Sequence, residues 1–222
     1  MQEEYSRGIA FIFEGETEKV FYSLLLRHYC TRNPSFSLEK RLNEKSGEVF
    51  YELVGEKGRV LVMMYVVGTI SQITNSGNWF AARCHAQHKG LDWSVVLCYD
   101  TDDYAAPITK FQEGDWANLR KSLSKQKAKT IIDMASNADI EDTMLLDSNN
   151  VFAFLDMSPV EIPRASKGKL KMKKLFRMKG RGTAYHEGTR ATPLIEALSF
   201  DVIIEKSDLP FSDLERACFQ DD

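Results

Sequence analysis

Two apolar runs in this chain each end in acidic residues. Residues 8–13 lead into Glu14, and residues 95–99 lead into Asp100. Carboxylates are the ligands that Mg²⁺ takes in proteins. Several of them close together are costly unless a cation neutralises them, because like charges at short range raise each other's pKa values. The pattern therefore predicts a metal-dependent enzyme that acts on phosphates.

Alternating strands and helices are predicted to position these acids. Hydrophobic runs predict buried strands over residues 7–13, 59–67, 93–99 and 130–134. Helical patterns cover residues 17–29, 69–88 (interrupted near 75–77), 116–127, a segment opening at 138–147 and a final helical hairpin over 193–219. Residues 45–57 are polar and punctuated by glycine. This order predicts an α/β fold with a parallel sheet.

Composition fits a globular chain with one large domain and a small appendage. The 222 residues are 43% hydrophobic and 27% charged, enough to bury a full core. We expect a catalytic domain over residues 1–150 and a basic helical extension over residues 151–222.

Several classes of protein are disfavoured. The acidic N-terminus does not resemble a signal peptide, and the longest apolar run, residues 60–67, is too short to span a bilayer. We expect a cytoplasmic protein without a membrane partner. The four cysteines form no C-x-x-C pair, which predicts reduced thiols. No P-loop motif occurs, so any ATPase partner has to be a separate chain.

The acids have a functional and a plain interpretation. Gly15 allows a sharp turn after Glu14 and room for a ligand. Asp100 and Asp102 point the same way if the strand pleat persists, and with Glu14 they can form a carboxylate cage for one or two Mg²⁺ or Mn²⁺ ions. The plain alternative is that these are solvated turn residues. Their joint appearance after two strands favours the metal site.

These residues also carry a family resemblance. Residues 14–18, Glu-Gly-Glu-Thr-Glu, resemble the E-G-x-T-E form of the Toprim motif, and residues 100–102 resemble its D-x-D motif. The resemblance covers about residues 6–150 and is closest to the nuclease branch with the OLD-family and RloB-like proteins. It implies a Toprim-like parallel sheet flanked by helices, a C-terminal helical extension and a role in anti-phage defence. Residues 140–146 are similar to a later motif of that branch, with Met144 in place of an aromatic residue.

A basic segment lies between residues 164 and 181, which contain no acid although the net charge of the chain is −3. One interpretation is a solvated helix face around the apolar residues 170, 172, 175 and 176. The other, which we favour, is a grip on a nucleic-acid backbone, with Lys173 or Lys174 near the carboxylates. The expected nucleic-acid-binding residues are Lys167, Lys169, Lys171, Lys173, Lys174, Arg177, Lys179 and Arg181.

Two other groups of residues are weaker candidates. Cys84, His85 and His88 offer soft ligands on one helix, but no second cluster completes a tetrahedral site, so helix packing is favoured. His186 beside Glu187 has the types needed for a general base, although such a pair in a loop is usually only solvated.

We therefore expect an Mg²⁺- or Mn²⁺-dependent nuclease acting on DNA or RNA. Glu14 is expected to bind the metal and assist proton transfer, and Asp100 and Asp102 to anchor it. The residues expected to hold a second ion or orient its waters are Glu18, Asp103 and Glu141. Lys173 is the expected cation for transition-state charge. The alternative is a non-catalytic module of the same fold that binds nucleic acid or a partner in a defence or mobile-element system.

Overall fold

The computed structural model describes residues 5–44, 47–56, 58–69, 72–104, 116–180 and 184–220. Its centre is a six-stranded sheet with the order β2-β3-β4-β1-β5-β6. The strands are β1 (Tyr5–Phe13), β2 (Phe36–Leu42), β3 (Val49–Gly55), β4 (Gly58–Val66), β5 (Trp93–Asp100) and β6 (Ala128–Ser136). Strands β4, β1, β5 and β6 are parallel to one another, whereas β3 is antiparallel to both β4 and β2.

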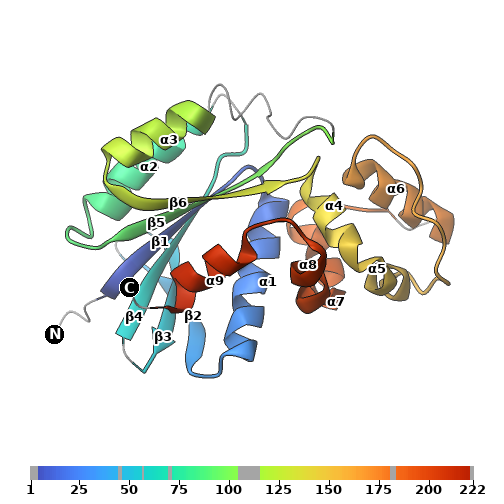
Figure 1. Ribbon diagram of the computed structural model, residues 1–222, viewed down its shortest axis with the longest axis horizontal. Helices are drawn as coiled ribbons and strands as arrows, with labels where there is room; N and C mark the ends of the chain where they lie inside the picture. Colours follow the sequence, from blue (N-terminus) through green and yellow to red (C-terminus); the bar gives the residue numbers. More distant parts are fainter. Residues whose placement is uncertain are drawn as a thin grey trace.

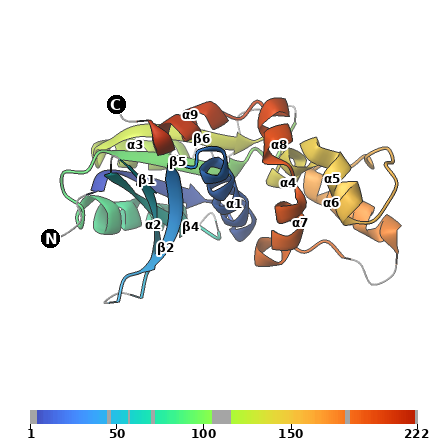
Figure 2. The same ribbon diagram turned by 90° about the horizontal axis from the view of Figure 1, so that it is seen from below.

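Helices cover both faces of the sheet, and a further group lies beyond the carboxyl ends of its parallel strands (Figures 1 and 2). Helices α2 and α3 lie on one face, α1 and α9 lie on the other, and α4 to α8 gather beyond the carboxyl ends of the parallel strands. The helical segments are α1 (Glu16–Arg32), α2 (Ile73–Trp79), η2 (Phe80–His85), α3 (Trp116–Lys125), α4 (Ile140–Met144), η4 (Leu145–Asp147), α5 (Ser148–Phe154), α6 (Gly168–Lys179), η5 (Gly188–Ala191), α7 (Thr192–Ala197), α8 (Phe200–Lys206) and α9 (Phe211–Phe219).

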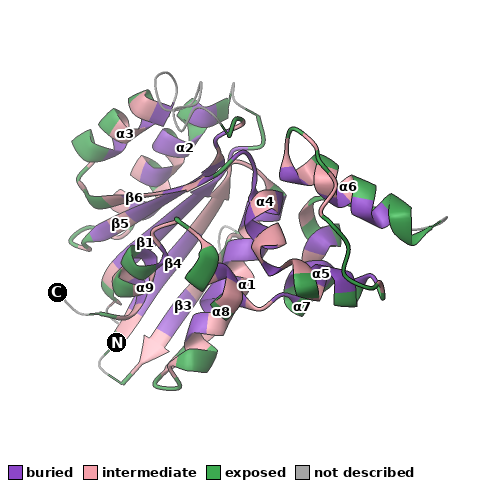
Figure 3. Cartoon of the chain, turned by 45° about the vertical axis from the view of Figure 1, so that its right-hand side comes forward, coloured by how far each residue is buried: buried purple, intermediate pink, exposed green. Residues whose placement is uncertain are grey.

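Strand β1 is the buried centre of the molecule (Figure 3). Residues 9–13 are fully inaccessible to solvent. Ile9, Phe11 and Phe13 join the core with α1 and the C-terminal helices, whereas Ala10 and Ile12 join the core beneath α2 and α3. A strand buried on both faces reads as a continuous apolar run, which is why this element was visible in the sequence.

The C-terminal helix closes the second face against the first strand. The Arg7 guanidinium donates through Nε to the carbonyl oxygen of Ala217 at 3.1 Å and through a terminal nitrogen to that of Cys218 at 2.9 Å. Arg7 thereby satisfies carbonyl groups at the C-terminal end of α9 that the helix itself leaves unpaired.

The expected α/β class and the four parallel strands are confirmed, but two strands were missed. Residues 45–57 contain β3, which pairs with β2 over Phe36–Gly55 to Leu42–Val49. Both strands were missed because polar residues interrupt their apolar pattern. Glu52, for example, is buried in β3 because it accepts hydrogen bonds from the Tyr5 hydroxyl (2.7 Å) and the Arg41 and Arg59 guanidinium groups (3.2 and 3.1 Å).

Two helical expectations were also wrong in detail. Residues 75–77 do not interrupt a helix, because they lie inside α2, where Gly77 allows α3 to approach; a Cβ at Gly77 would stand 3.4 Å from Leu119 and Ser122. Residues 193–219 form three helices, α7 to α9, instead of a hairpin. The breaks fall where the backbone becomes extended at Leu198 and at Ser207.

The domain boundary expected at residue 150 falls within α5. One core cluster contains Ile9 and Phe11 of β1 together with Phe152, Leu194 and Leu214 from beyond that boundary. All four cysteines carry free thiols. Within the described ranges, no helix is long and apolar enough to cross a membrane.

Gly8 provides a test of the packing between β1 and β5. A Cβ at this position would lie 2.5 Å from the indole ring of Trp93, which is the residue opposite it in β5. Gly8→Ala should therefore lower the free energy of unfolding by about 1–3 kcal/mol, as overpacking of a core does. The exposed change Ser6→Ala on the same strand should stay within about 0.5 kcal/mol of the parent in chemical denaturation. Equal stability of all three proteins would contradict this account of Gly8.

Candidate functional site

The carboxyl end of β1 lies at a point where the chain connections change sides. After β1 the chain enters α1 on one face, whereas β4 and β5 lead to α2 and α3 on the other. In open α/β sheets, ligands bind in the crevice that this change of side creates. Glu14, the first residue after β1, is fixed there because its N–H donates to Cys98 O (2.9 Å) and its carbonyl accepts from the Gly68 N–H (3.0 Å).

Asp100 joins Glu14 at this edge. Its backbone N–H donates to the Glu14 carboxylate at 3.2 Å, and its own carboxylate accepts from the Ile140 N–H, at the start of α4, at 3.0 Å. The ends of β1 and β5 and the beginning of α4 therefore meet at two side chains. The expected convergence of Glu14 and Asp100 is present.

Glu18 lies in the first turn of α1 and is only 5% exposed. Its carboxylate folds back over Gly15, where one oxygen would be 3.0 Å from a Cβ. Burial, with added repulsion from the charges of Glu14 and Glu141, raises the pKa of Glu18 to about 8. A side chain at position 15 would compete with this arrangement, which accounts for the glycine.

Two acids at the start of α4 complete the group. Asp139 is the N-cap of this helix, accepting from the Asp142 N–H at 3.0 Å, and burial raises its pKa. Glu141 is also buried and accepts the Tyr185 hydroxyl hydrogen bond at 2.7 Å. We call Glu14, Glu18, Asp100, Asp139 and Glu141 the carboxylate cluster.

The members of the carboxylate cluster destabilise one another's charged forms. Burial and the charges of Glu18 and Glu14 raise the pKa of Asp100 to about 10. Burial and the charge of Asp139 raise the pKa of Glu141 to about 7, although the Tyr185 hydrogen bond opposes the shift. Binding of protons or of a cation stabilises such a group, because it reduces the repulsion between the carboxylates.

Asp102 and Asp103 are placed differently from the sequence expectation. Strand β5 ends at Asp100, and Asp102 has a φ of 64°, so the pleat that was to align Asp100 with Asp102 does not persist. The Asp102 N–H donates to Ala138 O at 2.9 Å, and its carboxylate forms an ion pair with Lys167. Asp103 is exposed.

Helix α6 is joined to α4 by backbone hydrogen bonds to carboxylates. The Gly168 N–H donates to Asp142 at 2.7 Å, and the Lys169 N–H donates to Asp139 at 2.9 Å. A Cβ at Gly168 would overlap the backbone of Asp142, so only glycine permits this approach. The ion pair of Lys171 with Asp142, at 2.6 Å, adds to the contact.

The fold therefore divides the basic segment into lysines that pair with acids of the chain and cations that are exposed. Lys169 and Lys173 pair with Glu187, at 3.5 Å for Lys173. Lys167 pairs with Asp102, beside the carboxylate cluster, so the lysines whose charge acts on the cluster are Lys167 and Lys169 in place of Lys173 or Lys174. Lys174 donates to Arg164 O at 2.6 Å, and Lys179 pairs with Asp156 at 3.0 Å. The exposed cations of α6 are Lys174, Arg177 and Lys179. Arg181 lies outside the described residues.

The structure also shows what surrounds the weaker candidates from the sequence, at Cys84, His88 and His186. Cys84 is buried, and burial raises the pKa of its thiol. His88 stacks edge-on against Tyr5 and Trp93, and burial lowers the pKa of its imidazole. Glu187, next to His186, is the acceptor for Lys169 and Lys173.

Sequence reasoning missed Asp139, Gly168 and Tyr185 as parts of this site. Asp139 carried a usable signal, because an aspartate three residues before another acid is typical of a helix N-cap. Gly168 stood between two lysines and was read as part of a charge run. Nothing near Tyr185 in the sequence indicates its contact with Glu141, 44 residues away.

The carboxylate cluster supplies the kind of ligand that a hard cation binds. Every side chain of the carboxylate cluster offers oxygen ligands, and the raised pKa values of Glu18, Asp100 and Glu141 reflect charge that a cation would neutralise. Among the residues described, no group of three or more His, Cys, Asp or Glu side chains is arranged to hold an ion by itself. Mg²⁺ usually takes only one or two carboxylates and keeps several waters, so Glu14 and Asp100 with water suffice for it.

Comparison with known proteins assigns the chain to no family. No protein-family model matches the chain, and no curated protein matches it. The structures found include a futalosine hydrolase mutant of Helicobacter pylori strain 26695, with 12% identity, coverage of 92% of this chain and 100% of that chain, and a TM-score of 0.24. Helicobacter pylori MTAN has 11% identity, 96% and 98% coverage, and a TM-score of 0.26. Scores this low carry no functional argument.

The raised carboxyl pKa values predict a pH dependence of stability in the presence of EDTA. Between the ordinary pKa of 4.5 and the raised pKa of about 8, folded protein holds a proton on Glu18 that the unfolded chain releases. Stability should therefore fall as the pH rises through this range. Thermal unfolding at a series of pH values measures the effect.

A pair of variants assigns this dependence to Glu18. Glu18→Gln should make the decline less steep without removing it, because Asp100 and Glu141 also have raised pKa values. Glu16→Gln, a change at an exposed residue of the same helical turn, should leave the decline intact. A melting temperature that rises across the range would contradict the assignment.

Proposed function

We propose that the protein is an Mg²⁺- or Mn²⁺-dependent nuclease of Toprim type that cleaves phosphodiester bonds in DNA or RNA. The observation that carries the proposal is the carboxylate cluster, in which burial and the charges of neighbouring acids, Glu14 among them, raise the pKa values of Glu18, Asp100 and Glu141. The Toprim-like motifs supply Glu14, Glu18 and Asp100 of this group. The resemblance also implies anti-phage defence as the setting.

The residues divide into those that bind the cation and those that orient its surroundings. Glu14 and Asp100 offer the first carboxylate ligands, because they lie at the ends of neighbouring strands and the Asp100 backbone N–H holds the Glu14 carboxylate at 3.2 Å. Glu18 and Glu141 would accept hydrogen bonds from waters on such a cation. A bound Mg²⁺ or Mn²⁺ would activate a water and neutralise developing charge on the phosphate. Tyr185 fixes the orientation of Glu141 through its hydroxyl.

Lys167 takes the part expected of Lys173. Its ammonium contacts Asp102, and the charges of Asp100 and Asp139 contribute to the raised pKa of Lys167. A lysine at this position can contact a phosphate oxygen as charge develops in the transition state. Asp102 is then a residue that positions Lys167 instead of a metal ligand.

The exposed side of α6 is the proposed path for the nucleic-acid backbone. Lys174 and Arg177 are three residues apart, so they project from neighbouring turns of the same helix. Both are exposed, whereas Met172, Leu175 and Phe176 on the other side are buried. Lys167, Lys169, Lys171 and Lys173 contact acids of the chain and contribute less to such a path.

The second candidate function is a non-catalytic module that binds nucleic acid or a partner. The pairing of Lys167, Lys171 and Lys173 with Asp102, Asp142 and Glu187 favours the form that binds a partner, because fewer lysines are then left for a nucleic acid. The two candidates differ in one measurable property, which is metal-dependent cleavage.

Glu14→Gln should abolish cleavage while preserving the fold. The variant keeps the shape of the side chain but loses a charged ligand, so activity with Mg²⁺ or Mn²⁺ should fall at least the roughly 100-fold that loss of a metal-supporting group costs. Single-stranded and duplex DNA and RNA are the substrates to assay. Glu16→Gln is the matched control, because Glu16 is an exposed acid of the same motif and should be dispensable for activity.

Full activity of Glu14→Gln would remove Glu14 from the mechanism. Absence of metal-dependent cleavage in the parent protein, with nucleic-acid binding retained, would favour the non-catalytic module.

Neutralising Lys174 and Arg177 together should weaken binding to all sequences alike. Each lost phosphate contact should reduce the slope of log K against log[salt] by about 0.9 on duplex DNA or about 0.7 on single strands. Binding at several salt concentrations measures this for Lys174→Gln with Arg177→Gln. Lys40→Gln with Lys89→Gln removes the same charge from exposed positions elsewhere and should leave the slope unchanged. An unaltered slope in the first variant would place the nucleic-acid path elsewhere.

A further inference from the structure

Glu187 holds two lysines of α6 with one carboxylate. Its Oε2 contacts the Lys169 ammonium, and its Oε1 lies 3.5 Å from the Lys173 ammonium. Lys169 and Lys173 are four residues apart on α6, so they are neighbours on the surface of the helix. Each carboxylate oxygen therefore faces one ammonium group, and the two lysines share a single acid.

The lysine pair lies beside the carboxylate cluster. The Lys169 N–H donates to Asp139 at 2.9 Å, and Tyr185, two residues before Glu187, donates to Glu141 at 2.7 Å. Burial alone would lower the pKa of Lys169, but its contact with Glu187 and the charges of Glu141 and Asp139 raise it overall. An anion bound by the pair would therefore be next to the proposed cation site.

The backbone beside Glu187 is held in place, whereas its side chain is open to solvent. The Gly188 N–H donates to the Thr17 hydroxyl at 2.8 Å. The side chains of Lys169, Lys173 and Glu187 are 38%, 37% and 42% exposed. Water screens exposed ion pairs, so such pairs contribute little to stability. The Glu187 side chain can therefore turn away from the lysines without a change in the backbone.

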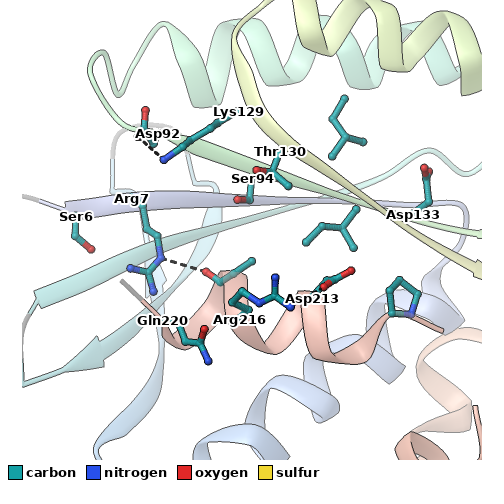
Figure 4. Close-up of a pocket in the computed structure, with 14 residues that line it drawn as sticks. Ser6, Arg7, Asp92, Ser94, Lys129, Thr130, Asp133, Asp213, Arg216 and Gln220 are labelled. Carbon is teal, nitrogen blue, oxygen red and sulfur yellow. Dashed lines mark hydrogen bonds and ion pairs between the residues drawn. The ribbon is translucent and has the colours of Figure 1, made fainter. Parts of the chain in front are cut away.

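The charges in the groove at the amino ends of the parallel strands are arranged differently (Figure 4). This groove, of about 910 Å³, is lined by β6, α9 and the beginnings of β1 and β5. Lys129 and Arg216 each have an acid of their own there, Asp92 and Asp213, both at 3.1 Å. The carboxylate of Glu187 differs from these one-to-one pairs, because it can neutralise only one of the two positive charges that it contacts.

We propose that Lys169 and Lys173 form a binding site for a phosphate of the nucleic-acid backbone, and that Glu187 occupies this site until the nucleic acid displaces it. A carboxylate and a phosphodiester each carry one negative charge on two equivalent oxygens, so either can bridge the two ammonium groups. Lysine binds phosphate as a compact point charge. The inference rests on the proposed function for its ligand, but it does not require cleavage.

The position of Arg177 supports a continuous path to this site. Lys169, Lys173 and Arg177 are spaced by four residues, so they follow one row along the surface of α6. Arg177 is exposed. A backbone that contacts Arg177 can therefore continue over Lys173 and Lys169 toward the carboxylate cluster once Glu187 has turned away.

Binding measured in EDTA tests the lysine pair. EDTA removes divalent cations, so the measurement does not depend on cleavage. Lys169→Gln with Lys173→Gln should reduce the slope of log K against log[salt] by about 1.8 on duplex DNA or about 1.4 on single strands, which corresponds to two phosphate contacts. Lys40→Gln with Lys89→Gln, at exposed positions elsewhere, should leave the slope unchanged. An unaltered slope in the first variant, or no binding by the parent protein, would overturn the proposal.

Glu187→Gln tests the competition. The variant keeps the shape of the side chain and loses its charge, so affinity for the same nucleic acids should rise by about two- to fivefold, as release of an exposed ion pair allows. Glu196→Gln removes the same charge from an exposed position on α7 and should give a smaller rise. The rise should disappear when Lys169 and Lys173 are both changed to glutamine. Equal rises in the two glutamate variants, or a rise that persists without the lysines, would overturn the competition.

The same measurements separate this inference from the proposed function. Metal-dependent cleavage by the parent, with an unaltered salt slope in the lysine variant, would keep the nuclease and remove the phosphate site. A reduced slope without any cleavage would support the site in a non-catalytic module. If the lysines only join Glu187 to α6, Glu187→Gln should lower the melting temperature and leave affinity unchanged, which would also overturn the proposal.

Discussion

Repulsion among buried acids is the interaction on which the rest of this structure depends. Parallel strands β1 and β5 end side by side, so Glu14 and Asp100 are brought to the same edge by the direction of the sheet. Glu18 and Glu141 are added by the helices that begin there. Burial then removes the water that would screen their charges, and their pKa values rise. Neighbouring elements supply hydrogen bonds to these carboxylates, from Ile140 N–H to Asp100 and from the Tyr185 hydroxyl to Glu141.

Helix α6 shows how the surrounding structure responds to this charge. Its N-terminal N–H groups bind Asp139 and Asp142, so the positive ends of α4 and α6 approach the same pair of carboxylates. Gly168 makes the approach possible, and Lys167 brings an ammonium to Asp102. Part of the positive charge of this segment therefore neutralises acids of the chain. Its exposed cations, Lys174, Arg177 and Lys179, can meet a long polyanion without breaking the contacts with Asp139, Asp142 and Asp102.

The sequence was informative where chemistry and periodicity coincided. Strand β1 was visible because its residues are buried on both faces, and Glu14 was visible because it follows that strand directly. Strands β2 and β3 were not, since Glu52 is buried through contacts with Tyr5, Arg41 and Arg59 that no local pattern reveals. Asp102 was misplaced because a left-handed residue ends the pleat, and Tyr185 was missed because its contact with Glu141 spans distant elements.

The contact of Arg7 with α9 has a consequence for how the chain folds during synthesis. Arg7 and Cys218 are 211 residues apart, so the partner of β1 is synthesised long after β1 itself. Until then, the face of the sheet that α9 covers is open to other apolar surfaces. Contacts of such long range slow folding and lengthen the time in which a nascent chain can aggregate. The apolar face of the sheet is thus expected to stay exposed for as long as α9 takes to dock.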